Sequence, residues 1–161
     1  MTTSQETALE SPRFVDSPER LFAGFGERYE YTSIEGIPNL WYRFGPHIDQ
    51  VPNRVGQATY GLSFGGDQTS FDYMAGVEIS SADGVGDMYR IVTAPAARYA
   101  VFRHQGHVSG IRQTCEQIWR QWLPASGMQF APTPMFERYG EEFDPASVSG
   151  VVEIWCPIVE K

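Results

Sequence analysis

Two glutamates stand beside aromatic residues in stretches that alternate between apolar and polar positions, which is the pattern of a β-strand. Glu153 and Trp155 fall on one side of the alternation over residues 151–159, and Glu137 shares a side with Tyr139 in the strand predicted just before it. A carboxylate among aromatic rings loses water, which disfavours its anionic form unless a cation or a hydrogen-bond donor compensates. The faces of aromatic rings also attract cations. This pairing therefore indicates a site for lipophilic, positively charged molecules.

Aromatic residues are abundant, since 10 Phe, 8 Tyr and 4 Trp make up 14% of the 161 residues. That content exceeds the needs of a core of this size, and we expect part of it to line a cavity. The predicted ligand contacts are Glu153, Glu137, Trp155, Trp41, Tyr60, Tyr73, Tyr99 and Tyr139. The competing interpretation of Glu153 is an ordinary glutamate on a solvated sheet face, paired with an arginine. Because a strand register can shift by one residue, both glutamates are candidates for the main contact.

The elements that would position these residues occur twice along the chain. Alternation predicts strands over residues 21–25, 59–64, 71–80, 98–104, 135–140 and 151–159, and helical spacing predicts helices over 33–44 and 108–123. Residues 40–46 align with residues 118–124, so that Trp41 corresponds to Trp119. The sequence therefore predicts an internal duplication, with half-repeats at about 19–80 and 97–159, each a strand–helix–strand–strand unit.

Neither half could bury its helix and both faces of its strands alone. Packed about a pseudo-twofold axis, the two halves give an α+β fold, in which one curved, largely antiparallel sheet carries both helices on one side. Val152, Ile154 and Cys156 would face the helices, and a ligand groove centred on Glu153 would lie on the opposite face. We expect residues 19–161 to form this single domain and the polar residues 1–18 to form a flexible N-terminal arm.

Composition excludes several classes of function. The formal net charge of −8 argues against direct nucleic-acid binding as the main task, because an acidic surface repels phosphate. No apolar run approaches the ~20 residues of a membrane-spanning helix, and no apolar signal segment follows Met1. Two free cysteines suit a cytoplasmic protein. Since no metal-ligand cluster, nucleotide-binding loop or serine-nucleophile motif occurs, we expect neither a metal nor a cofactor.

Motifs along most of the chain resemble the GyrI-like, or AraC-type effector-binding, family of small-molecule-binding domains. The resemblance runs from about Leu21 to Glu160 and includes Phe-Glu-Arg-Tyr at 136–139. Three runs are together specific: residues 98–106, Trp-Leu-Pro-Ala-Ser-Gly at 122–127 and Glu-Ile-Trp-Cys-Pro-Ile at 153–158. It implies the same tandem fold and a groove in which a buried glutamate meets the charge of cationic or aromatic ligands. On this chain that glutamate is Glu137 or Glu153. The DNA-binding module of the family's regulators has no counterpart here, so the resemblance is to a stand-alone member.

Three functions are compatible with this resemblance, and the oligomeric state is left open. The favoured one is a binder of hydrophobic, aromatic, often cationic small molecules, as in multidrug or toxin recognition. The second is a hydrolase of cyclopropane-bearing electrophilic natural products, in which a glutamate orients or deprotonates water and a tyrosine hydroxyl donates to the developing oxyanion. Its candidate catalytic residues are Glu153, Glu137 and Tyr139. The third is a protein partner that protects or inhibits DNA gyrase.

Overall fold

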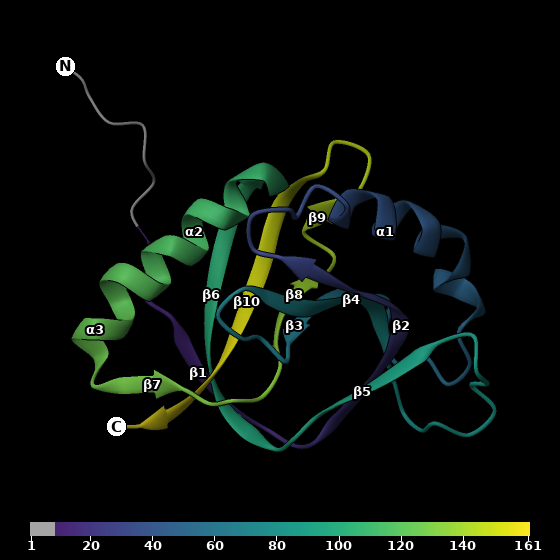
Figure 1. Cartoon of the computed structure of the whole chain (residues 1–161), viewed down its shortest axis with the longest axis horizontal. Coiled ribbons are helices and arrows are strands. Elements are labelled where there is room, and N and C mark those ends of the chain that lie inside the picture. Colours follow the sequence, from purple (N-terminus) through teal and green to yellow (C-terminus); the bar gives the residue numbers. More distant parts are fainter. Residues whose placement is uncertain (1–8) are drawn as a thin grey trace.

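Alternating apolar residues build one antiparallel sheet of ten strands in the computed structural model, which describes residues 9–161. The strands are β1 (Arg13–Ser17), β2 (Arg20–Glu30), β3 (Thr59–Phe64), β4 (Ser70–Ile79), β5 (Arg90–Ala94), β6 (Ala97–His107), β7 (Met128–Phe130), β8 (Met135–Tyr139), β9 (Phe143–Asp144) and β10 (Ser149–Glu160). Their order is β1-β6-β10-β8-β3-β4-β2-β5, with β7 and β9 also paired to β10. The two half-repeats therefore meet at the β8–β3 pair, in the middle of the sheet (Figure 1).

The first predicted helix forms over a shorter span. α1 (Ile37–Phe44) begins after Gly36 rather than at Ser33, and Pro38 lies in its first turn. Proline is tolerated there because its missing N–H would have no partner within the helix. The chain then continues as the 3₁₀-helix η1 (Gly45–Gln50), so the helical segment extends beyond its predicted end.

The second predicted helix is longer and less regular than expected. It consists of η2 (Val108–Gly110), α2 (Ile111–Gln117), the π-helical turn η3 (Ile118–Trp122) and α3 (Leu123–Ser126). Pro124 does not end this segment, because it occupies the first turn of α3. Gly127, in the left-handed conformation with φ 76°, ends it instead. The wider π turn accompanies an exposed Trp119, which is 47% exposed, although helical spacing places Trp119 on the apolar stripe.

The edge strands of the sheet are exchanged between the two halves. β1 precedes β2 in the chain but pairs with β6, and β5 precedes β6 but pairs with β2. Residues 13–17 thus belong to the sheet, and the predicted flexible arm is wrong for them. Their side chains are mostly exposed, so they carry little apolar alternation by which a strand could be recognised. Residues 1–8 of that predicted arm lie outside the described residues.

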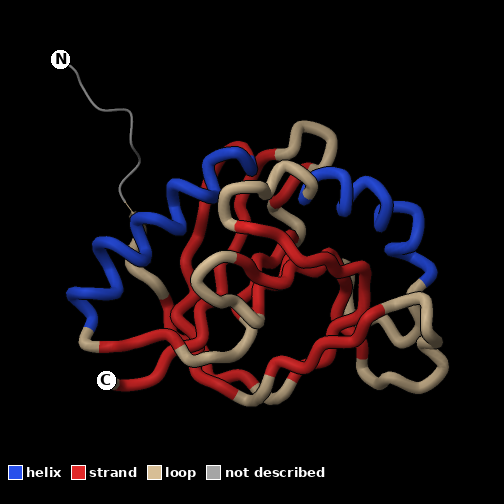
Figure 2. The backbone as a smooth tube through the Cα atoms, viewed as in Figure 1, coloured by secondary structure: helices blue, strands red, loops and turns tan. Residues whose placement is uncertain are grey.

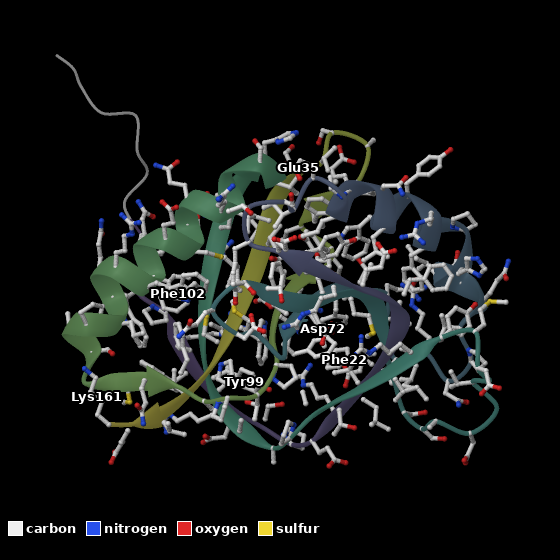
Figure 3. All side chains as sticks on the ribbon, viewed as in Figure 1. Phe22, Glu35, Asp72, Tyr99, Phe102 and Lys161 are labelled. Atoms are coloured by element: carbon white, nitrogen blue, oxygen red, sulfur yellow. The ribbon has the colours of Figure 1, made fainter. Side chains whose placement is uncertain are left out.

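The two faces of the sheet bury different clusters. On one face α1 packs against β2 and β4, and α2 packs against β6 and β10. Val152, Ile154 and Cys156 lie on this face, which confirms their predicted contact with the helical side. The other face curls around a core of its own (Figure 2). Figure 3 shows Phe22 and Tyr99 inside this curl, whereas Phe102 lies beside α2.

Phe136 lies in the core inside the curl, and its removal should be costly. Its side chain is 1% exposed, and its ring stacks on Trp155 at a centroid distance of 5.3 Å. We expect Phe136→Ala to lower the free energy of unfolding by about 3–5 kcal/mol in urea denaturation, because it leaves a cavity. Phe14→Ala is the matched control, since Phe14 is 46% exposed. Equal losses in the two variants would contradict this placement of the core.

Candidate functional site

The sheet divides the eight predicted ligand contacts between its two faces. Glu153 of β10 is paired with Arg138 of β8 rather than with Glu137. Because successive residues of a strand point to opposite faces, the two glutamates lie on opposite faces of the sheet. The residues on the helical face are Trp41, Tyr73, Glu137 and Tyr139, and those on the face inside the curl are Tyr60, Tyr99, Glu153 and Trp155.

The aromatic lining predicted for a groove on the face opposite the helices is wrong, because those side chains are packed in the core and the hollow beside Glu153 is lined mostly by charged residues. Its aromatic members are core residues with exposed fractions of at most 5%: Tyr60, Tyr99 and Trp155. Glu153 forms an ion pair with Arg13 at 2.9 Å and accepts a hydrogen bond from the Trp155 indole at 3.2 Å. The guanidinium group of Arg20 lies 4.9 Å from the centroid of the Trp155 ring. The chain's own arginines thus occupy the positions predicted for a cationic ligand.

On the helical face, hydrogen bonds join four residues into what we call the Glu137 cluster: Trp41, Tyr73, Glu137 and Tyr139. The Tyr139 hydroxyl donates to Glu137 Oε1 at 2.6 Å, and the Tyr73 hydroxyl also donates to this carboxylate. Trp41 Nε1 donates to the Tyr73 hydroxyl at 2.9 Å. The Trp41 ring meets the Tyr139 ring edge-on, with centroids 5.5 Å apart. The cluster therefore ties α1 to β4 and β8, across the junction of the two halves.

The absence of a side chain at Gly61 makes room for this cluster. Gly61 is the residue of β3 that pairs with Glu137. A Cβ atom at this position would overlap the Tyr73 hydroxyl and would lie 3.1 Å from Glu137 Oε1. Sequence reasoning did not select Gly61 as a functional residue. The available signal was a glycine inside an alternating strand, which marks a close approach of other groups to the backbone.

Burial and hydrogen bonding set the protonation behaviour of the cluster. Burial raises the pKa of the Glu137 carboxyl, and the hydrogen bonds from Tyr139 and Tyr73 oppose this shift. Burial and the adjacent Glu137 charge raise the pKa of both tyrosines well above the ordinary value, so their hydroxyls remain protonated donors. Among residues 9–161, no basic side chain forms an ion pair with Glu137, whereas Glu153 is paired with Arg13.

The cluster is partly open to solvent and is bordered by both helical segments. Trp41, Glu137 and Tyr139 are half-buried. The ring of Phe143 in β9 packs edge-on against the ring of Tyr139, with the ring centroids 4.9 Å apart. Cys115 of α2 is also half-buried, and burial, followed by the Glu137 charge, raises the pKa of its thiol to about 12. The arrangement places one carboxylate without a basic partner among the described residues beside the rings of Trp41 and Tyr139.

Two further features of the described part of the chain are the grouping of its metal-ligating residue types and the length of its helices. Within it, no three His, Cys, Asp or Glu residues are grouped so that they could hold a metal ion. None of its helices combines the length and the apolar character that crossing a lipid bilayer requires.

Comparison with known protein families and curated proteins gives two matches. The model of the GyrI-like small molecule binding domain matches residues 10–159, which confirms the resemblance found in the sequence. The transcriptional regulator BrlR of Pseudomonas aeruginosa is 28% identical over 150 residues. That alignment covers 91% of this chain and 54% of BrlR, so the chain spans about half the length of the regulator.

Solved structures confirm the fold as a curled antiparallel sheet with two helices. SAV2435, in a structure bound to tetraphenylphosphonium, superposes with a TM-score of 0.76 at 21% identity, over 93% of this chain and 94% of that one. An integron cassette protein of Vibrio cholerae gives a TM-score of 0.70 at 16% identity, over 94% and 97% of the respective chains.

Substitution of Gly61 tests the geometry of the Glu137 cluster. We expect Gly61→Ala to lower the free energy of unfolding by about 1–3 kcal/mol, because the added methyl group overlaps the Tyr73 hydroxyl. Gly45→Ala is the control, since a Cβ atom there meets nothing within 4 Å. Chemical denaturation of both variants provides the comparison. If Gly61→Ala is as stable as Gly45→Ala, the cluster is not packed as described.

Proposed function

The chain belongs to the GyrI-like family of small-molecule-binding domains, and we propose that it binds lipophilic aromatic cations at the Glu137 cluster. One observation carries the proposal: the half-buried Glu137 carboxylate lies among aromatic rings and has no cationic partner among the described residues. Such a carboxylate attracts a cation more strongly than one in water does, because the local dielectric constant is lower. Tetraphenylphosphonium, present in the SAV2435 structure, is a cation of this class.

Each member of the cluster has a role in this proposal. Glu137 supplies the charge, and the rings of Trp41 and Tyr139 supply cation–π attraction of about 0.5–2 kcal/mol each. Tyr73 positions the carboxylate and is itself held by Trp41. The other four predicted contacts stabilise the core and the far face of the sheet instead.

The hydrogen bonds of Glu137 bear on the kind of cation that binds. Two tyrosine hydroxyls already donate to the carboxylate. A ligand therefore contributes charge and apolar surface rather than N–H donors. On this basis the site favours delocalised cations without N–H groups over primary ammonium ions, and it tolerates variety of shape, as multidrug recognition requires.

We further propose that this binding takes place in the cytoplasm and without direct contact with nucleic acid. Both cysteines are free thiols, as is common in a reducing compartment. The net charge of −8 opposes approach to a phosphate backbone.

The charge of Glu137 is tested by removing it without changing the shape of the side chain. We expect Glu137→Gln to weaken tetraphenylphosphonium binding more than tenfold, or about 1.4 kcal/mol, in isothermal titration calorimetry. Glu153→Gln is the matched control, because this carboxylate lies on the opposite face and is paired with Arg13. Similar affinity of Glu137→Gln and the unmodified chain, with both folded by circular dichroism, would refute the charge role.

The raised pKa of Glu137 makes cation binding depend on pH. As the pH falls through this pKa, the carboxyl becomes protonated and loses its charge. We expect affinity for tetraphenylphosphonium to decrease on acidification, beginning at a pH above that of a glutamate in water, whose pKa is about 4.3. In Glu137→Gln the affinity for tetraphenylphosphonium should not change over the same pH range. A similar decrease in that variant would assign the effect to another group.

A second candidate function is hydrolysis of cyclopropane-bearing electrophiles at the same cluster. The raised pKa of Glu137 suits a general base, and Tyr139 stays protonated beside it as a hydrogen-bond donor. Glu153 has no place in this reaction, because it lies on the other face of the sheet.

Hydrolysis is tested with a spirocyclopropyl-dienone, whose ring opening is followed by absorbance. The expected result is turnover above the buffer rate that Glu137→Gln abolishes. Turnover equal to buffer removes this function for the substrate tested and leaves the binding proposal untouched.

A further inference from the structure

A row of charged residues crosses the sheet on the face opposite the Glu137 cluster. Arg103 of β6, Glu153 of β10 and Arg138 of β8 lie directly opposite one another on adjacent strands. Arg13 of β1 reaches the same glutamate. These four residues line a surface hollow of about 410 Å³. Three guanidinium groups from three different strands therefore border one concave site.

The carboxylates around this hollow pair with its arginines to different degrees. Glu153, whose side chain is 19% exposed, pairs with Arg13 at 2.9 Å and lies 3.7 Å from Arg138. Arg103 pairs with Glu142, whose side chain is 67% exposed, at 3.2 Å. The Arg103–Glu142 pair is exposed, and pairs of this kind contribute between 0 and about 1 kcal/mol. Arg103 can therefore turn toward a ligand at little cost, whereas Arg13 is paired with the largely buried Glu153.

Arg138 is held in place before any ligand arrives. It donates a hydrogen bond to the Tyr60 hydroxyl, which is in the core. Its guanidinium group lies close to the backbone at Gly140, where a Cβ atom would come within 2.5 Å of Nη1. Arg138 and the more exposed Arg103 and Arg13 therefore form a site in which one guanidinium group is already positioned.

We propose that this hollow binds a small molecule that carries two negative charges on closely spaced oxyanion oxygens, as a phosphate monoester or a short dicarboxylate does. The planar guanidinium group donates two parallel N–H bonds to either group, which an ammonium group cannot do. Three carboxylates also line the hollow and oppose an anion: Glu141, Glu142 and Glu153. A doubly charged, compact group is therefore required to compete with them. Since the site lies on the far face of the sheet, the proposal does not depend on cation binding at Glu137.

Binding is tested by titrating inorganic phosphate and, separately, malonate into the full chain at neutral pH and constant ionic strength. Calorimetry and the arginine Nε–H resonances in NMR spectra provide the two readouts. We expect saturation at one site, with shifts at Arg138 and Arg103. The probe that binds more tightly distinguishes a phosphate ligand from a dicarboxylate ligand. Titrations of both probes that never saturate would overturn the proposal.

Variants separate this site from general attraction of anions. We expect Arg103→Gln to weaken binding about tenfold, which is about 1.4 kcal/mol. Arg103→Lys should also weaken it, because the charge remains but the paired N–H donors are lost. Arg112→Gln is the control, since Arg112 is exposed on α2 and does not line the hollow. Equal weakening by Arg112→Gln, or weakening by Glu137→Gln, would place the anion elsewhere and contradict the proposal.

Discussion

A partly buried carboxylate needs hydrogen-bond donors or a cation nearby, and this requirement explains the arrangement around Glu137. Two tyrosine hydroxyls meet it in part, and the indole of Trp41 orders one of them. The negative charge is left without a basic partner in the described part of the chain. On the opposite face Glu153 meets the same requirement with Arg13. One glutamate is therefore neutralised by the chain itself, and the other is the one at which we propose that a cation binds.

The duplicated fold brings the parts of the cluster together from both halves. α1, β3 and β4 of the first half contribute Trp41, Gly61 and Tyr73, and β8 of the second half contributes Glu137 and Tyr139. The central β3–β8 pair joins the halves, so the carboxylate lies at their junction. Exchange of the edge strands β1 and β5 further ties each half to the other. A site at such a junction is supported by the packing of the whole sheet.

Much of the fold could be predicted from the sequence, because alternation and helical spacing are local signals. β3 was predicted with its observed bounds, and Val152, Ile154 and Cys156 were placed on the correct face. β1 was missed because its side chains are mostly exposed, and β5 was missed because its exposed Ile91 interrupts the apolar alternation of the buried Val92 and Ala94. Only four of the eight predicted ligand contacts lie together, in the Glu137 cluster on the helical face of the sheet. Alternation within a strand shows which residues share a face, but the relation between Glu137 and Glu153 depends on the register of β8 against β10, a long-range property.

The state of the Glu137 carboxyl tests the account most directly. Its ¹³C resonance can be followed through a pH titration in NMR, first in the free protein and then with tetraphenylphosphonium present. We expect the pKa of Glu137 to lie above the ordinary glutamate value of about 4.3 in the free protein, and to be lower once the cation stabilises the anionic form. An ordinary pKa that the cation leaves unchanged would contradict it.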